Sequence, residues 1–228
     1  MKKNLAIAFT ALLLSCSENK IEEYKEEVVK QQFDTITIGK TVYNMQTLTD
    51  TNFSFAKPFA YGESDSVLAL YKHLARRDSD TLFLSCDNNK IVKFVNDHSD
   101  ENYTTYDFKF FNKDINAYVV YCSLYESSSV WLVNKETGDS LETIGFPFAS
   151  PNKKKFVCYN LDLEAAFTLN GFELFDYTNS TYISKGLREI NNWGPEKIKW
   201  KDDTTLIVRA ISGYGDPTKV SFKAIYIK

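Results

Sequence analysis

Cysteine and histidine are the residues of this chain best suited to nucleophilic or acid–base chemistry, and the chain has few of them. Its two histidines are His73 and His98, and every Ser-His-Asp or Cys-His site would have to use one of them. No G-x-S-x-G turn or other nucleophile motif accompanies either histidine. The sequence therefore predicts no catalytic residue, and we expect a protein that is not an enzyme.

Three of the four cysteines, Cys86, Cys122 and Cys158, recur at intervals of 36 residues, each at or near the end of an apolar run. Equivalent positions in neighbouring repeats lie farther apart than the roughly 7 Å between Cα atoms that a disulfide can bridge. We therefore expect free, buried thiols, with one disulfide as the most that three cysteines allow. No C-x-x-C pair accompanies them, so no metal site is predicted there.

Carboxylates are numerous, but the sequence does not select a pair that would work together. Asp97, Asp100 and Glu101 could supply oxygen ligands to Ca²⁺, but their spacing does not match an EF-hand, and a solvated turn is favoured. A glycosidase needs two carboxylates that converge in a cleft. There is no G-x-x-x-x-G-K-[ST] loop and glycine is scarce, so no nucleotide or other cofactor is predicted.

The fourth cysteine, Cys16, ends a segment typical of an export signal. A basic start at residues 1–3 precedes an uncharged apolar run over residues 5–14. This run is shorter than the roughly 20 residues that span a bilayer and has the length of a signal-peptide core. Residues 13–16, Leu-Leu-Ser-Cys, resemble the lipobox of bacterial lipoproteins. The alternative is an ordinary signal peptide with an incidental cysteine.

This resemblance implies that residues 1–15 are removed as a signal peptide and that Cys16 carries acyl chains. Each buried methylene contributes about 0.8 kcal/mol, so two or three chains would hold the protein on a membrane. The residue after Cys16 is Ser17, where enteric inner-membrane lipoproteins tend to have Asp, which favours the outer membrane of a bacterial cell envelope. Residues 16–33 are expected to form the lipidated N-terminus and a tether, either a solvated spacer or a short docked helix.

Residues 34–228 are expected to form a single β-repeat domain. Hydrophobic residues make up 43% of the chain and aromatic residues 15%, with few glycines and prolines, a composition that favours half-buried strands. The net charge of −3 argues against a nucleic-acid partner, which requires a basic surface.

Four similar units follow one another along this domain. Each has an apolar segment, a charged turn, a central apolar run and a further strand. The central runs are residues 81–86, 118–122, 156–159 and 205–209, the preceding segments are 67–71, 106–111, 146–149 and 198–200, and the following strands are 91–95, 130–133, 172–175 and 220–227. A period of roughly 40–50 residues with about four strands per unit is typical of propeller blades.

Residues 148–157, with the turn Ser-Pro-Asn-Lys-Lys, resemble the Ser-Pro-Asp-Gly-Lys turn of TolB-like and WD-like β-propeller repeats. Residues 171–176 and 131–138 are similar to the strand and the outer hairpin of such a blade. The resemblance implies an all-β fold with a propeller-like array of about four antiparallel blades. The chain departs from the family because it has no Trp-Asp dipeptide and Asn152-Lys153 replaces Asp-Gly, so a β-sandwich and an open β-repeat are the alternatives. If the array closes, a hairpin at residues 34–43 is predicted to complete the last blade beside residues 220–227.

Two aromatic loops are the candidate ligand-binding segments. They contain Phe53, Phe55, Phe59, Tyr61 and Trp193, and exposed aromatic side chains are frequent binding hot spots. The alternative is that these rings complete the core.

We expect a membrane-anchored cell-envelope lipoprotein that acts as a non-enzymatic binding or interaction module for a protein, peptide or glycan. The alternatives are an envelope hydrolase acting on glycan or peptide, and a structural subunit of a larger assembly.

Overall fold

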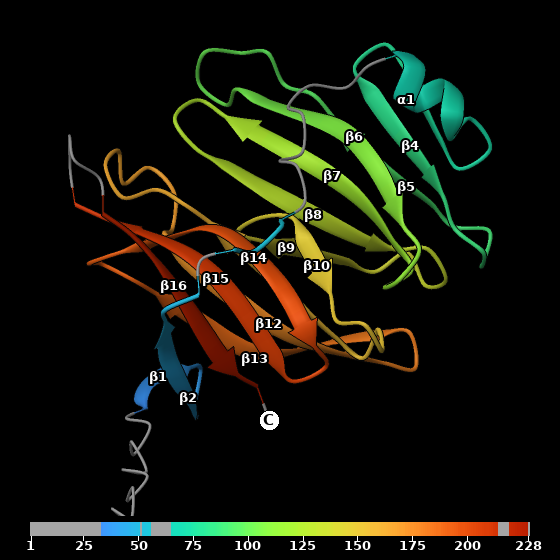
Figure 1. Ribbon diagram of the computed structural model, residues 1–228. Coiled ribbons are helices and arrows are strands. Elements are labelled where there is room, and N and C mark those ends of the chain that lie inside the picture. The colour runs from blue at the N-terminus through green and yellow to red at the C-terminus, as the bar shows by residue number, and fades with distance from the viewer. Residues whose placement is uncertain (1–32, 51, 56–64, 214–218, 228) are drawn as a thin grey trace, which may run out of the picture. The chain divides into compact units, whose positions relative to one another are not determined.

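Antiparallel strands form nearly all of the secondary structure (Figure 1). The computed structural model describes residues 33–50, 52–55, 65–213 and 219–227. Cys16, the predicted signal peptide and nearly all of the predicted tether lie outside the described residues, as do Phe59 and Tyr61.

The strands make four antiparallel sheets. The first sheet contains β3 (Ala75–Asp78), β4 (Thr81–Ser85) and β5 (Ile91–Val95), and it follows the helix α1 (Asp65–Leu70). The second sheet contains β6 (Thr104–Asn112), β7 (Ala117–Leu124), β8 (Ser128–Asn134) and β9 (Ser140–Thr143). The third sheet contains β10 (Pro147–Ala149), β11 (Lys155–Asn160), β12 (Gly171–Thr178) and β13 (Thr181–Glu189). The fourth sheet contains β14 (Gly194–Asp202), β15 (Thr205–Ser212) and β16 (Lys219–Tyr226), followed in space by β2 (Thr41–Leu48) and β1 (Asp34–Ile38).

The predicted repeat is confirmed, because the four central apolar runs give the second strands of the four sheets, β4, β7, β11 and β15. In the turn between β10 and β11, the side chain of Ser150 and the backbone of Lys153 stabilise the turn conformation. The buried hydroxyl of Ser150 accepts the backbone N–H of Lys155 at 3.0 Å. Lys153 adopts a left-handed backbone with φ of 62°, at the position where the propeller-like turn has glycine. The turn therefore keeps the glycine-like conformation without the glycine.

The first unit differs from the prediction. Residues 67–71, expected as a strand, fall in α1 and the turn that follows it, and the first strand is instead β3. Val67, Leu68 and Tyr71 pack together against the core of the first two sheets, at a spacing that suits a helix. Five apolar residues are too few for their periodicity to distinguish a helix from a strand, so the prediction was wrong here. The charged segment 76–80, expected as a turn, also lies largely within β3.

Three clusters of buried side chains join the sheets in chain order. Leu82 and Leu84 of the first sheet meet Phe108 and Tyr118 of the second. The cluster between the second and third sheets includes Leu132 and Phe156, and the cluster between the third and fourth includes Phe172 and Leu206. The fold is an all-β, propeller-like array of four antiparallel blades. None of these three clusters, which cover only the described residues, joins the first sheet to the fourth.

This packing explains why the central run in β7 is continuously apolar. In β7, Tyr118 and Val120 pack toward the first sheet, whereas Ala117 and Val119 pack toward the third. A strand that is covered on both faces has no solvent-facing side to place polar residues on. The edge strand β13 is mostly exposed and carries the polar residues accordingly.

The N-terminal hairpin completes the fourth sheet beside β16, the position that the sequence predicted for it on the condition that the array closes. β1 pairs with β2, and β2 pairs with β16 from Asn44 opposite Tyr226 to Leu48 opposite Phe222. At the hairpin turn, the backbone N–H of Gly39 donates to the carbonyl oxygen of Leu187 in β13 at 3.3 Å. The beginning and the end of the β-domain are therefore held in one sheet.

We predict that Gly39→Ala destabilises the domain by breaking this contact. Gly39 has φ of 59°, and a Cβ atom at this position would lie 2.2 Å from the carbonyl oxygen of Lys185. The strain and the displaced backbone together should lower the free energy of unfolding by about 2–3 kcal/mol, measured by urea denaturation. Gly213→Ala is the matched control, because Gly213 also has a positive φ (92°) but nothing lies within 4 Å of the added Cβ. Equal losses in the two variants would contradict a role for the close approach.

Candidate ligand-binding site

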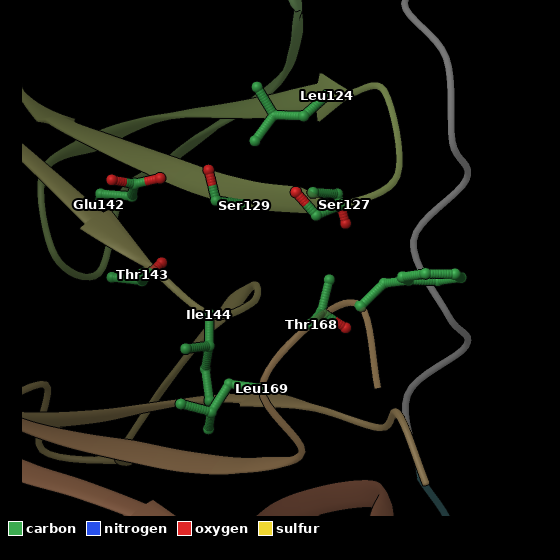
Figure 2. Close-up of a pocket in the computed structure, with 10 residues that line it drawn as sticks. Leu124, Ser127, Ser129, Glu142, Thr143, Ile144, Thr168 and Leu169 are labelled. Carbon is green, nitrogen blue, oxygen red and sulfur yellow. The ribbon is translucent and has the colours of Figure 1, made fainter. Parts of the chain in front are cut away.

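A cleft lies between the second and third sheets (Figure 2). The turn between β7 and β8, the end of β9 and the loop of residues 161–170, which joins β11 to β12, form its walls. The ten lining residues are Leu124, Ser127, Ser128, Ser129, Glu142, Thr143, Ile144, Phe167, Thr168 and Leu169. Its volume of about 230 Å³ is below the roughly 300–1,000 Å³ of pockets that enclose a whole small molecule. The cleft is therefore sized for one part of a larger ligand.

Asp162 organises the loop that forms one wall of the cleft. Its carboxylate accepts the backbone N–H groups of Ala165 at 3.1 Å, Ala166 at 2.9 Å and Thr168 at 2.7 Å, and the hydroxyl of Thr168 at 2.9 Å. Partial burial alone would raise the pKa of Asp162, but these hydrogen bonds outweigh it and lower the pKa. The loop is thus built around an ionised carboxylate, and it leaves the side chain of Phe167 57% exposed.

Asn170 joins this loop to the next connection along the chain. Its buried side-chain amide donates to the carbonyl oxygens of Ile190 at 2.5 Å and Trp193 at 2.9 Å. Its side-chain oxygen accepts the backbone N–H of Asp162 at 3.3 Å. The loop that lines the cleft is therefore tied to the segment that carries Trp193.

Two glutamates from adjacent sheets interact at the cleft. Glu142 of β9 lines the cleft, and the half-buried Glu173 of β12 accepts the backbone N–H of the lining residue Ile144 at 3.1 Å. Burial raises the pKa of Glu173 most, the Ile144 hydrogen bond lowers it, and the charge of Glu142 raises it, so that the pKa lies above its usual value. Glu142 is the one charged residue among the ten that line the cleft.

Phe53 and Phe55, predicted as ligand-binding residues, pack on the fourth sheet. Both are half-buried, with ring centroids 5.6 Å and 6.4 Å from that of Phe222. The ammonium nitrogen of Lys199 lies 5.4 Å and 5.5 Å from the two ring centroids. Neither residue lines the cleft. Both rings pack against Phe222, as expected of residues that complete the core. A role of Phe53 and Phe55 in ligand binding stays a prediction.

Trp193 is also half-buried and packs against the cluster between the third and fourth sheets. Its ring lies 6.2 Å from that of Phe172, and the ammonium nitrogen of Lys223 lies 5.3 Å from it. Trp193 does not line the cleft, although Asn170 connects its backbone to the wall of the cleft. Its proposed contact with a ligand likewise stays a prediction.

The histidines lie away from the cleft. His98 is exposed, with its ring nitrogen 3.1 Å from a carboxylate oxygen of Asp80, and His73 lies in the turn after α1. Asp97 accepts the backbone N–H of Ser99 at 2.9 Å, a turn interaction that lowers its pKa. Among the described residues, no three His, Cys, Asp or Glu side chains gather where they could hold a metal ion.

The prediction of free, buried thiols is confirmed for Cys86, Cys122 and Cys158. Burial raises the pKa of each thiol, and for Cys158 the charge of Glu173 raises it further. Thiols held in this protonated form are poor nucleophiles and poor metal ligands.

The cleft, its lining residue Glu142 and the adjacent Glu173 were missed at the level of sequence. Glu142 and Glu173 come from different sheets, and no local motif links them. A partial signal is the segment of residues 161–170, where Asp162 precedes Thr168 in a stretch without strand alternation and a phenylalanine lies between them. Such a segment indicates a carboxylate-centred loop, but not that it faces another sheet.

Comparison of the chain with protein-family models, curated proteins and solved structures finds no match. Among the residues that the structure describes, no helix has the length and apolar character needed to cross a membrane.

We predict that Asp162→Ala loosens the wall of the cleft. The variant should speed hydrogen exchange at the amides of Ala165, Ala166 and Thr168, because each loses its acceptor. In the wild-type protein, the protection of the same amides against hydrogen exchange should fall once the pH drops through the lowered pKa of Asp162. A carboxyl with a lowered pKa contributes stability above its unfolded value, about 3.9, and this contribution is lost below the folded pKa.

The matched control is Glu164→Ala, which removes an exposed carboxylate from the same loop. It should leave the protection of these three amides unchanged. If both variants raised exchange to the same extent, the hydrogen bonds to Asp162 would not be what orders the loop.

Proposed function

We propose that the protein is a lipid-anchored component of a bacterial cell envelope whose β-domain is a non-enzymatic binding module. The anchor is supported by the lipobox-like residues 13–16, the basic start and the short apolar run before them. Acyl chains on Cys16 would hold the domain on a membrane, and Ser17 favours the outer membrane. Residues 16–33 would then separate the lipid from the first strand.

The cleft is the observation that carries the binding function. Large apolar side chains stay exposed on its walls and beside it, namely Leu124 (39%), Phe167 (57%) and the neighbouring Tyr125 (79%). Leaving such side chains in water loses the free energy that burial would gain, so their collection beside a hollow marks a surface that a ligand covers. The ligand would be a protein, peptide or glycan.

Trp193 lies in the connection between β13 and β14. This connection starts at the same end of the third sheet as the loop of residues 161–170, which lines the cleft. In an antiparallel meander, the turn after the second strand and the exit of the fourth strand lie at one end. The cleft is lined by residues from both positions, namely the turn after a second strand and the exit of a fourth strand. Trp193 follows the fourth strand of the third sheet. Phe53 and Phe55 follow β2, which occupies the fourth position of the fourth sheet. These topologically equivalent ends are where we propose that the domain meets its ligand.

A second candidate function, hydrolysis of a glycan, is favoured by the glutamate pair. Glycosidases use one carboxyl that stays protonated beside a second that is ionised. The raised pKa of Glu173 and its interaction with Glu142 resemble this division. Glu173 itself is not among the residues that line the cleft, so the binding function is preferred.

The anchor predicts the effect of Cys16→Ala. This variant should lose fatty-acid labelling and membrane attachment, measured by growth with radiolabelled palmitate and by cell fractionation. Cys86→Ala is the control, because Cys86 is buried in the β-domain and should not affect labelling. Undiminished labelling of the Cys16→Ala protein would place the acylation site elsewhere.

Binding without turnover distinguishes the two candidate functions. Full-length protein in detergent micelles should bind at least one ligand saturably from sets of envelope glycan fragments, peptides and envelope proteins. The ligand should be recovered with its bonds intact. If the protein cleaves a glycosidic bond and the Glu173→Gln variant does not, the hydrolase function holds in place of the binding function. Failure to bind any of the three ligand classes would refute the binding function.

A further inference from the structure

We propose that the cleft between the second and third sheets binds one unit of a neutral glycan. This inference rests on the proposed binding function and selects one of its three ligand classes. It is carried by the charge of the cleft, the hydroxyl groups that line it, the exposed apolar side chains at its walls and its size.

The charge of the cleft disfavours anionic ligands. Glu142 is the charged residue among the ten that line the cleft, and Glu173 holds the backbone of the lining residue Ile144. The Glu142 carboxylate, with no lysine or arginine among the lining residues, disfavours phosphate, sulfate and carboxylate groups. A neutral ligand pays no such penalty, and its hydroxyl groups can donate to Glu142.

Hydroxyl groups dominate the polar lining. Ser127, in the turn before β8, and Ser128, the first residue of β8, line the cleft on the side opposite the loop of residues 161–170 (Figure 2). The hydroxyl oxygen of Ser129 is buried beside Cys122 and does not belong to this surface. The hydroxyls of Thr143 and Thr168 are hydrogen-bonded within the protein and hold the walls in place. A hydroxyl both donates and accepts, so the hydroxyls of Ser127 and Ser128 beside a carboxylate match a ligand that is itself rich in hydroxyls. A simple cation would gain from the carboxylates but not from this hydroxyl surface.

The apolar walls match the other face of a sugar. Phe167 and Leu124 line the cleft and remain exposed, and Phe167 projects from a loop that Asp162 holds in shape. The face of an aromatic ring carries partial negative charge and attracts the C–H groups of a pyranose ring. Because the loop is ordered before binding, little entropy is lost when the ring is covered.

The size of the cleft favours one unit of a polymer. A volume of about 230 Å³ cannot enclose a drug-sized ligand. A glycan can place one sugar in the cleft while its neighbours extend over the surface.

Titration calorimetry of the full-length protein in detergent micelles tests this inference. The probes are neutral hexasaccharides of glucose, mannose and xylose, the anionic hexagalacturonate, and decalysine as a cationic peptide. At least one neutral hexasaccharide should bind, and Phe167→Ala and Ser128→Ala should each weaken it about tenfold, which corresponds to about 1.4 kcal/mol. Tyr103→Ala, which removes an exposed aromatic ring from another loop, should leave the affinity unchanged. Near-ultraviolet circular dichroism checks that each variant keeps its fold.

Preference for hexagalacturonate or decalysine over every neutral hexasaccharide would overturn the inference. Neutral binding that is unchanged in both Phe167→Ala and Ser128→Ala would overturn it too, because the sugar would then occupy another site. A protein that binds a peptide or an envelope protein but none of the saccharides would refute the glycan and leave the binding function standing. Loss of all binding would refute both.

Discussion

The pairing of β2 with β16 is the interaction on which the rest of the β-domain depends. Without it, β16 would be an edge strand with an unpaired row of backbone groups, and the fourth sheet would have only three strands. The pairing also sets the hairpin turn at Gly39 against β13, so that the third and fourth sheets are joined by backbone contact as well as by buried side chains. The N-terminal strand β2 thus completes a sheet whose other long strands, β14, β15 and β16, come from the C-terminal part of the chain.

The cleft is a consequence of how neighbouring sheets pack. The second and third sheets meet through Leu132, Phe156 and other buried residues, and their connecting loops extend past this core at one end. The walls there come from two sheets, so the hollow persists only while both keep their positions. Asp162 adds local order, because one carboxylate satisfies several backbone N–H groups that would otherwise need water or a different loop conformation. This combination of a rigid scaffold and a loop with an exposed phenylalanine is the physical basis of the proposed binding surface.

Sequence reasoning succeeded where the physical cause was local and repeated. The central apolar runs recur because each gives the second strand of an antiparallel sheet, with side chains buried against a neighbouring sheet. It failed at residues 67–71, where a short apolar segment has the same composition whether it forms a helix or a strand. Phe53, Phe55 and Trp193 were correctly located in connections, but their partners Phe222 and Phe172 lie far away in sequence.

The sequence by itself determined the all-β class, the four repeated units and the free thiols. Each follows from spacing or composition, which the covalent chain carries directly. The tertiary structure alone decided that Glu142 and Glu173 interact, that Asp162 shapes a wall and that Phe167 remains exposed beside a hollow. Such features depend on distances between side chains from different sheets, and those distances exist only after the buried apolar surfaces have brought the sheets together.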